Sequence, residues 1–253
     1  MRGLSGAVVT VNDDNTVTKA GGIPERTREQ GEWIIQHGGE MFPKVLKIIP
    51  DGYVMEKLTY IDYCDVGSDF NISTLKDHVW TQPAVVPPTS RTKELLEAKM
   101  QHAIDKYIGN AVSNVVKLEI MMNARIAAEG VYSFEPCLTH GDPTSENVMI
   151  RDGFGKVFID PIRATEVVPD SPVVDVGKVL QSAYAWEDAK YQTGLIAYGH
   201  EDIARALNNP HLLHYGEAWA VVHVMRAIPY VLRNIPDSFD RVLKVLSRAI
   251  ERW

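Results

Sequence analysis

The sequence predicts an α+β fold with two lobes, a small strand-rich lobe at residues 1–58 and a larger, mainly helical lobe at residues 59–253. Short runs of β-branched residues separated by turn residues fill the first sixty positions, which indicates hairpins. After residue 90, apolar residues recur at three- and four-residue spacing, which is the period of amphipathic helices. A chain of 253 residues is long enough to bury a sizeable core in such a fold.

Two hairpins and one helix are expected in the first lobe. The runs AVVTV and TVTK flank the turn residues Asn12 to Asn15, and VLKII and YVMEKL flank Asp51-Gly52. Between these hairpins, ERTREQGEWIIQHGGE is typical of a helix, because Pro24 suits a first helical turn and Gly38-Gly39 suits a helix end.

The pattern changes after Leu58. Residues 59–90 have little periodicity, and the prolines of TQPAVVPPTS predict a loop or linker. One long amphipathic helix is expected over residues 95–116, with a break near Gly109. Short strands are then expected at NVMI and VFID, joined by the turn RDGFG, and helices return from Asp175 to the end of the chain.

The composition argues against several classes of protein. Lys and Arg number 26 against 33 Asp and Glu, and this net charge of −7 disfavours a general nucleic-acid binder, which needs a basic face. No run reaches the roughly 18 apolar residues of a membrane span, and the N-terminus lacks the apolar core of a signal peptide. Two cysteines, Cys64 and Cys137, fit a reducing compartment. We therefore expect a soluble, cytoplasmic protein without a nucleic-acid or membrane partner.

The stretch LTHGDPTSENVMI, residues 138–150, contains more polar chemistry than a loop requires. His140, a glycine and Asp142 are adjacent, and Asn147 stands just before an apolar run. With average residue usage, the pattern HGDxxxxN arises by chance in a chain of this length on the order of once in a thousand sequences. The alternative is that Asp142 and Asn147 only form turns and that Asp160 only caps a strand, which explains the combination less well.

These residues suit phosphoryl transfer from ATP. Asn147 opens one strand of the expected hairpin and Asp160 ends the other, so a tight turn at Asp152-Gly153 brings two oxygen ligands together. Carboxylate and amide oxygens are suitable ligands for Mg²⁺. Asp142 lies on the loop, where it can orient an acceptor hydroxyl and take its proton. His140 is expected to hold the loop through hydrogen bonds rather than to move protons.

HGDPTSENVMI followed by VFID resembles the catalytic and metal loops of the aminoglycoside phosphotransferase and choline kinase family, which has a protein-kinase-like fold. The resemblance implies that Asp142 is the catalytic base and that Asn147 and Asp160 are the Mg²⁺ ligands. Asp175, in VVDVGKVLQS, resembles the family's later Asp, which supports the catalytic loop from a helix start. A plain N-cap is an equally good interpretation of Asp175.

The resemblance extends to the nucleotide site. TVTKA resembles the strand whose Lys holds the α- and β-phosphates of ATP, which makes Lys19 the candidate. GLSGAVVTV resembles the loop over the phosphates, where Ser5 and backbone N–H groups would cradle phosphate oxygens. YVMEKL resembles the hinge, and backbone groups from Glu56 to Leu58 would bind adenine.

One position departs from the family pattern. The family pairs its Lys with a Glu on the first helix, and apolar side chains follow that Glu three and four residues later. Here the apolar pair Trp33-Ile34 has this relation to Gln30, whereas Glu29 and Glu32 lie one and two positions away. Either Glu29 faces Lys19 and forms the ion pair, or the uncharged Gln30 stands in the position of the family's Glu. We expect Glu29.

The resemblance implies an ATP- and Mg²⁺-dependent kinase that acts on a hydroxyl of a small molecule, with a sugar-like, amino-alcohol or aminoglycoside-like acceptor. A group of residues in the C-terminal helices could attract a cationic acceptor, although a solvated helix face explains most of their charges better. These residues are Glu187, Asp188, Glu201, Asp202, Glu217 and Trp219.

Two other functions compete with this one. A nucleotide-binding regulator of the pseudokinase type, without phosphotransfer, is suggested by the uncertain partner of Lys19 and opposed by the intact Asp142, Asn147 and Asp160. A kinase acting on protein Ser or Thr is disfavoured, because about fifteen residues between Asp160 and Asp175 are too few for an activation segment.

Overall fold

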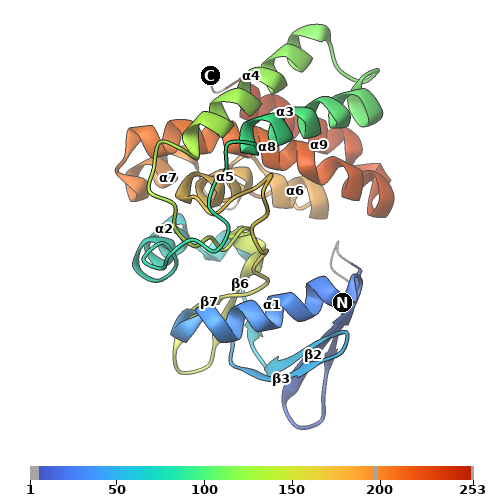
Figure 1. Cartoon of the computed structure of the whole chain (residues 1–253). Coiled ribbons are helices and arrows are strands. Elements are labelled where there is room, and N and C mark those ends of the chain that lie inside the picture. The colour runs from blue at the N-terminus through green and yellow to red at the C-terminus, as the bar shows by residue number, and fades with distance from the viewer. Residues whose placement is uncertain (1–5, 197–198, 252–253) are drawn as a thin grey trace.

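The computed structural model describes residues 6–196 and 199–251 and has the predicted α+β architecture (Figure 1). A four-stranded antiparallel sheet in the order β1-β2-β4-β3 forms the N-lobe. Both predicted hairpins are present in this sheet, one at β1–β2 and the other at β3–β4. The strands are β1 (Ala7–Val11), β2 (Thr16–Gly21), β3 (Val45–Ile49) and β4 (Gly52–Glu56).

Helix α1 (Pro24–His37) connects the two hairpins and packs on their sheet. Its proline stands in the first turn, as the sequence predicts. The helix approaches β4 closely at Gly31, where an added Cβ would lie 2.7 Å from the ring of Tyr53. Trp33 and Ile34 are buried beneath it. In Figure 1, α1 lies on the side of the N-lobe that faces the helical lobe.

A second, three-stranded sheet follows the first lobe, in the order β5-β6-β7. It consists of β5 (Thr59–Tyr60), β6 (Val148–Arg151) and β7 (Gly155–Phe158). The chain thus changes sheets after Glu56, because β5 pairs with β6, which is about ninety positions later. The β6–β7 hairpin is the one predicted at NVMI and VFID, and Val148 stands opposite Phe158. Figure 1 shows it between the two lobes.

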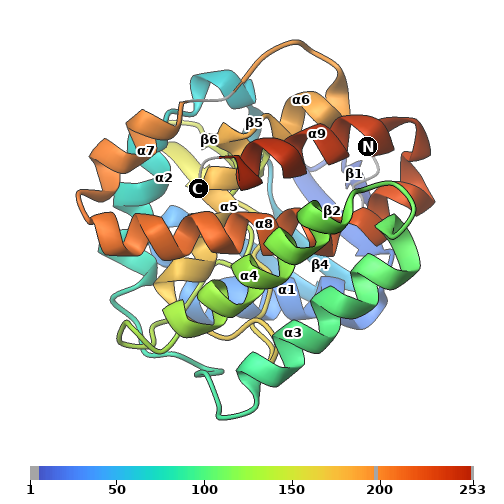
Figure 2. The ribbon, with the colours of Figure 1, turned by 90° about the horizontal axis from the view of Figure 1, so that it is seen from above.

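The C-lobe is mainly helical, and α8 crosses it beside α4 (Figure 2). Within the described ranges, no helix is long and apolar enough to span a membrane. The helices are α2 (Ser68–Thr74), α3 (Thr92–Ala103), α4 (Asn114–Gly130), α5 (Pro172–Ala183), α6 (Trp186–Tyr191), α7 (His200–Leu207), α8 (Pro210–Asn234) and α9 (Phe239–Ile250).

The structure confirms one expectation about these helices and corrects another. The stretch 95–116 is broken near Gly109, as expected: α3 continues through a π-helical turn to Ile108, and α4 starts afresh at Asn114. Ser113 begins the new helix by accepting a hydrogen bond from the backbone of Val116, and Val115 is 67% exposed. Helix α2 and the π-helical turn after it lie in a segment where the sequence showed too little periodicity to predict a helix. So short a helix is stabilised by tertiary packing and need not show a periodic apolar pattern.

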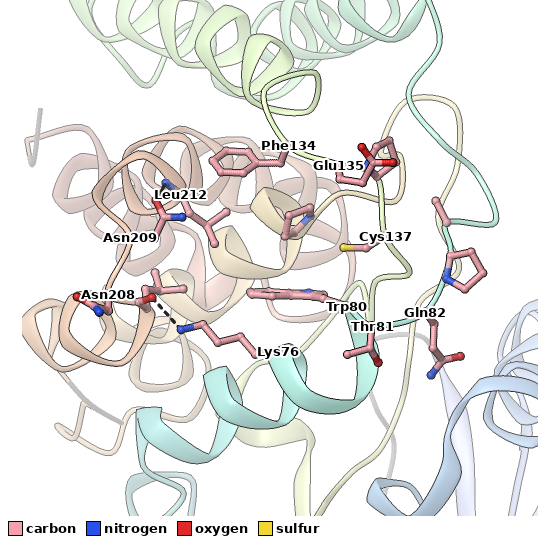
Figure 3. A pocket seen from close by; sticks show the side chains of 15 residues that line it. Lys76, Trp80, Thr81, Gln82, Phe134, Glu135, Cys137, Asn208, Asn209 and Leu212 are labelled. Atoms are coloured by element: carbon pink, nitrogen blue, oxygen red, sulfur yellow. Dashed lines mark hydrogen bonds between the residues drawn. The ribbon is translucent and has the colours of Figure 1, made fainter.

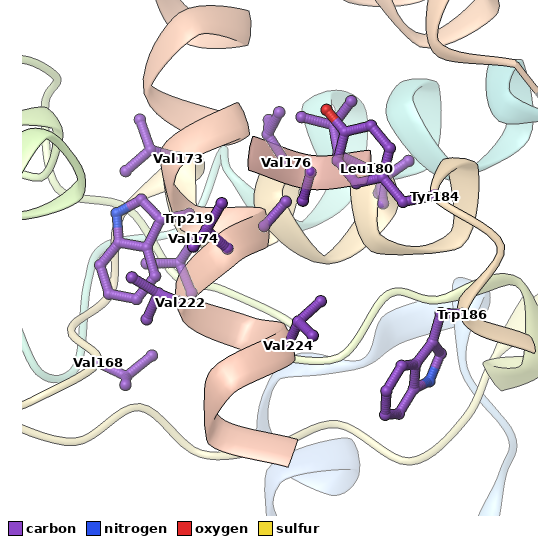
Figure 4. Close-up of a cluster of buried hydrophobic side chains, with 14 of the residues drawn as sticks. Val168, Val173, Val174, Val176, Leu180, Tyr184, Trp186, Trp219, Val222 and Val224 are labelled. Atoms are coloured by element: carbon purple, nitrogen blue, oxygen red, sulfur yellow. The ribbon is translucent and has the colours of Figure 1, made fainter. Parts of the chain in front are cut away.

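The core of the C-lobe lies between α5 and α8 (Figure 4). Its buried side chains include Val173, Val176, Leu180 and Val222, and burial of each contributes about 1.5–3 kcal/mol. The helices approach so closely that a Cβ at Gly177 would lie 2.5 Å from Cβ of Trp219. This packing fixes the rotation of α5, and with it the direction of the polar residues on its other face.

Candidate active site

The catalytic loop, residues 138–147, leads into β6 and is shaped by a close backbone contact. Gly141 has φ +77°, and a Cβ there would lie 2.2 Å from the carbonyl oxygen of Ile162. The backbone N–H of Ile162 donates to the carbonyl of His140 at 2.7 Å. Glycine is therefore required between the histidine and the aspartate, both for its positive φ and for the space it leaves.

Asp175 anchors this loop from α5. Its buried carboxylate accepts hydrogen bonds from the backbone N–H of His140 at 3.0 Å and of Gly141 at 2.8 Å, and from the indole of Trp80 at 3.0 Å. Burial raises the pKa of Asp175 to about 7, while the three donors favour its ionised form. The interpretation of Asp175 as a plain N-cap is wrong: Ser171 stands at the N-cap position, and Asp175 lies one turn inside the helix.

His140 is fully buried and holds the loop. Its ring lies 4.8 Å from that of Phe158 and 5.5 Å from that of Phe42. Its Nδ1 accepts a hydrogen bond from the backbone N–H of Asp142 at 3.1 Å. Burial lowers the pKa of His140 to about 4, so the ring is neutral near pH 7. A neutral, enclosed imidazole of this kind positions the neighbouring Asp142 and is poorly placed to exchange protons.

Asp142 carries its carboxylate between two partners. Oδ1 pairs with the ammonium of Lys178 at 2.9 Å, and Oδ2 accepts a hydrogen bond from Asn147 Nδ2 at 3.0 Å. Burial by itself would raise the pKa of Asp142, but the charge and hydrogen bond of Lys178 hold it below its ordinary value. The side chain remains 22% exposed, so an ionised carboxylate is presented to an incoming group.

The β6–β7 hairpin places Asn147 and Asp160 at neighbouring strand ends. The backbone N–H of Ile159 donates to the carbonyl of Asn147 at 2.9 Å, and Asp160 follows with φ +57°. Because Nδ2 of Asn147 donates to Asp142, its Oδ1 is left as a possible ligand. The described part of the chain has no group of three or more His, Cys, Asp or Glu that could hold a metal. One carboxylate and one amide oxygen nevertheless fit Mg²⁺, which takes few protein ligands when phosphates complete its shell.

Lys19 approaches this hairpin from β2. Its ammonium lies 2.6 Å from Asp160 Oδ1 and 3.0 Å from Gln30 Oε1. The expectation that Glu29 pairs with Lys19 is wrong. With Trp33 and Ile34 packed inward, Gln30 on the same face of α1 meets Lys19, whereas Glu29 is turned toward Arg163 at 3.8 Å.

The remaining predicted nucleotide contacts stay predictions. Ser5 lies outside the described residues. Glu56 ends β4. Its carboxylate accepts a hydrogen bond from the backbone N–H of Lys44 at 2.7 Å and forms an ion pair with Arg151 at 2.7 Å. Leu58, two positions later, is buried. Any contact with adenine in this segment would therefore come from the backbone, as the resemblance implies.

Lys178 and Asp170 contribute to the site but were not singled out from the sequence. Lys178 follows Asp175 by three positions, so the two lie on one face of α5, a spacing that could have identified it. Asp170 accepts hydrogen bonds from the backbone and hydroxyl of Thr139 at 3.1 and 2.7 Å, and from two backbone N–H groups at Val85 and Val86. No local pattern reveals Asp170, because its partners lie about 30 and 85 positions away.

The residues expected to attract a cation are mostly engaged elsewhere. Glu187 is buried and accepts a hydrogen bond from Ser182, and Glu217 contacts His200 at 2.6 Å. Trp219 is buried, and its indole donates to the carbonyl of Ala127. Three of the six residues named for a cationic acceptor are therefore engaged in contacts within the protein.

A hollow of about 880 Å³ lies in the C-lobe (Figure 3). Trp80 and Cys137 line it beside Lys76, whose ammonium donates to the carbonyl of Leu207 at 2.8 Å. Trp80 links it to the catalytic loop, because its indole donates to Asp175. Cys137, which also lines it, directly precedes that loop. Asp142, Asn147 and Asp160 do not line it, so this hollow is separate from the residues described above.

Residues 81–207, just over half of the chain, match the phosphotransferase enzyme family. The chain belongs to this family. The match covers the catalytic loop, the β6–β7 hairpin and α5, which carry Asp142, Asn147, Asp160 and Asp175, whereas Lys19 lies outside it. A search of curated proteins found no match.

Solved structures of several phosphotransferases share the fold. The choline kinase LicA from Streptococcus pneumoniae has a TM-score of 0.67 at 11% identity, covering 100% of this chain and 92% of that one. A complex of LicA with AMP scores 0.59 at 12% identity, covering 98% and 90%. The gentamicin-APH(2″)-IIa complex scores 0.57 at 13% identity, covering 98% and 90%. An ethanolamine kinase from Plasmodium vivax scores 0.59 at 11% identity, covering 96% and 80%. The predicted protein-kinase-like fold is confirmed.

Proposed function

We propose that this family member is an ATP- and Mg²⁺-dependent kinase that phosphorylates a hydroxyl group of a small molecule. The observation that carries the proposal is the convergence of Asp142, Asn147 and Asp160 from one loop and one hairpin, with Lys19 reaching them from the N-lobe. Phosphoryl transfer requires such an arrangement, because its catalysis consists mainly of positioning and charge stabilisation. The AMP complex of LicA, which has the same fold, supports a nucleotide as the donor.

Each side chain has a role that follows from its contacts. The ionised carboxylate of Asp142 orients the acceptor hydroxyl and takes its proton as the oxygen bonds to the transferred phosphorus and the ADP oxygen leaves. Lys19 binds phosphate oxygens of the nucleotide. Asn147 and Asp160 would hold Mg²⁺, which supplies positive charge against the phosphates. His140 and Asp175 keep Asp142 in position through backbone hydrogen bonds.

The acceptor belongs to the small hydroxyl compounds that this fold serves elsewhere, namely sugar-like, amino-alcohol or aminoglycoside-like molecules. Choline, ethanolamine and gentamicin are named with the structures of similar fold. A nucleotide-binding regulator without phosphotransfer is not favoured, because it would have no need of a partly exposed, ionised Asp142 beside Asn147 and Asp160.

The proposal is tested by incubating the protein with ATP, Mg²⁺ and a panel of acceptors. Release of ADP and the mass of the product are then measured. Asp142→Asn keeps the shape of the side chain and should lower kcat by about 10²–10⁴-fold, because a general base contributes about that much. Asp77→Asn is the matched control, since this carboxylate is exposed on the surface. Equal turnover by Asp142→Asn and the parent would refute the assignment of the base.

Metal dependence is tested separately. Chelation of Mg²⁺ with EDTA should stop transfer, and addition of excess Mg²⁺ should restore it. Asp160→Ala should raise the Mg²⁺ concentration needed for half-maximal activity, because the only carboxylate at the hairpin end is lost. An unchanged Mg²⁺ requirement in this variant would place the metal elsewhere.

A further inference from the structure

Three successive turns of α5 contact the catalytic loop through polar side chains. Asp175 accepts hydrogen bonds from the backbone of the loop. One turn later, the ammonium of Lys178 lies 2.9 Å from Oδ1 of Asp142. One turn further, Ser182 accepts a hydrogen bond from the backbone N–H of Ser145 at 3.3 Å. These positions share one face of the helix because of their three- and four-residue spacing. Asp175 and Ser182 hold the backbone of the loop, whereas Lys178 contacts the side chain that is proposed to react.

Two oxygen atoms hold the ammonium of Lys178 in position. Besides its ion pair with Asp142, it donates a hydrogen bond to Oε1 of Gln181 at 3.0 Å. Gln181 is fully buried, and its Nε2 has no hydrogen-bond partner among the described residues. Because an ammonium can only donate, the amide oxygen must face Lys178, and the unpaired amide nitrogen costs free energy. The orientation of this buried amide therefore serves the ammonium, which indicates a site where its position matters.

One N–H bond of Lys178 remains for a ligand. An ammonium has three N–H bonds, and the described residues supply two acceptors for them, on Asp142 and Gln181. The side chain of Lys178 is 13% exposed and that of Asp142 is 22% exposed, so the pair is largely enclosed but still reaches solvent. A charge-assisted hydrogen bond to an anionic ligand is strong in such surroundings, because water screens it less than on an open surface.

The contact with Asp142 places this N–H bond close to the reacting atoms of the proposed transfer. The acceptor hydroxyl must lie within about 3 Å of the carboxylate of Asp142 to give up its proton. Its oxygen must also approach the γ-phosphorus to roughly 3–3.5 Å, in line with the leaving oxygen of ADP. The non-bridging oxygens of the transferred group are therefore close to Asp142, on which the ammonium of Lys178 already lies.

The charge on Asp142 changes during the proposed reaction, and this change redirects the attraction of Lys178. Before transfer, the ionised carboxylate attracts the ammonium. When the carboxylate takes the proton of the hydroxyl it becomes neutral, while negative charge stays on the phosphoryl oxygens. The ammonium is then attracted more strongly to the phosphoryl group than to Asp142. An interaction that strengthens on the way to the transition state lowers the barrier, whereas one of constant strength does not.

We propose that Lys178 is a second catalytic residue, whose ammonium binds a non-bridging oxygen of the transferred phosphoryl group. The inference rests on the proposed kinase function and holds for each acceptor class named there. The acceptor oxygen bonds to the γ-phosphorus, the bond from this phosphorus to the bridging oxygen breaks, and ADP leaves with the electron pair. The acceptor proton goes to Asp142, and Lys178 keeps its three protons. Lys19 lies elsewhere in the site, beside Asp160.

The first test measures binding without turnover. ADP with Mg²⁺ and aluminium fluoride mimics the phosphoryl group in transfer, and its affinity is compared with that of ADP and Mg²⁺ alone by isothermal titration calorimetry. Lys178→Met should weaken the fluoride complex by about 10- to 100-fold, as expected for one lost charge-assisted hydrogen bond, and leave the affinity for ADP within about twofold. Lys178→Arg keeps a charged donor and should recover part of the loss. Lys93→Met, which removes an exposed charge on α3, is the control.

The unchanged affinity for ADP also verifies that Lys178→Met is folded. Equal affinity of Lys178→Met and the parent for the fluoride complex would overturn the proposal. Equal weakening of the fluoride complex and of ADP alone would also overturn it, because Lys178 would then support the fold or the nucleotide rather than the transferred group.

A double-mutant cycle separates direct contact from an effect through Asp142. In Asp142→Asn the side chain carries no charge, so Lys178 can no longer act by stabilising the ionised base. Lys178→Met introduced into Asp142→Asn should still weaken the fluoride complex by at least about tenfold. Loss of the effect in this background would assign Lys178 to the base alone and would refute the contact with the phosphoryl group.

Transfer kinetics distinguish this inference from the proposed function. With the acceptor that releases ADP fastest, kcat of Lys178→Met should fall by about 10²–10³-fold at a pH where the rate no longer depends on pH, as when one donor to developing charge is removed. An unchanged kcat at that pH would refute the role of Lys178 and leave the kinase established. Fluoride binding that depends on Lys178, without transfer to any compound of the panel, would refute the proposed acceptors and leave the contact of Lys178 established.

Discussion

Replacement of Lys178 by methionine removes the positive charge beside Asp142 and leaves the position of Asp142 unchanged. The ammonium lies 2.9 Å from Oδ1 of Asp142, and both side chains are largely enclosed, at 13% and 22% exposure. Met has a similar length and leaves the α5–α8 packing intact. In the variant, burial continues to raise the pKa of Asp142, while its main opposing charge is gone.

The expected shift follows from the distance. Two unit charges at 2.9 Å attract by about 1.4 kcal/mol in the dielectric of water and by about 6 kcal/mol at an effective dielectric constant of 20. These values correspond to about 1 and 4 pKa units. Because both groups retain some solvent, we expect the pKa of Asp142 to rise by about 1–3 units in Lys178→Met.

The assay is the pH dependence of kcat/KM, which reports the ionisation of the free enzyme. In the parent, Asp142 is already ionised below its ordinary pKa, so the acid limb lies at low pH. In Lys178→Met the acid limb should move to higher pH by the expected rise in the pKa of Asp142, so activity is lost at a higher pH when the solution is acidified. Lys93→Met, which removes an exposed charge on α3, should leave the limb in place. An unmoved limb in Lys178→Met, with folding verified by circular dichroism, would refute the assignment of Asp142 as the titrating base.

Three further predictions concern the nucleotide site, the core and the loop. Lys19→Met should raise the KM for ATP by about 10- to 100-fold in steady-state kinetics, since it removes the cation proposed to bind the phosphate oxygens, and an unchanged KM would make its ion pair with Asp160 purely structural. Gly177→Ala should lower the free energy of unfolding by about 1–3 kcal/mol in urea, because its Cβ would meet Trp219, and an undiminished midpoint would contradict the packing. Burial lowers the pKa of His140 to about 4, so the folded protein binds fewer protons than the unfolded chain between pH 4 and 6.5. Stability therefore falls by about 3 kcal/mol as the pH drops through that window, and His140→Asn should show a smaller loss in parallel urea titrations.

The order of the elements was readable from the sequence because local rules govern it. Alternating strands around turn residues predicted β1 to β4, and Pro24 and the glycines after His37 marked α1. The HGD triplet and Asn147 could be placed on one loop because they are close in the sequence. Asp160 could be placed near Asn147 because a short turn sets the register of the hairpin between them. At residues 95–116 the glycine marked the break near Gly109, but apolar spacing continues across the break and did not show where α4 begins.

By itself the sequence determined which chemical groups the chain offers and which of them are neighbours along one strand, one turn or one helical face. The tertiary structure alone decided that Gln30 rather than Glu29 meets Lys19, and that Lys178 pairs with Asp142. The physical reason is that the rotation of each helix follows from what its buried face packs against. The packing of the buried faces therefore decides which polar side chains on the opposite faces meet, although those side chains are not part of the core.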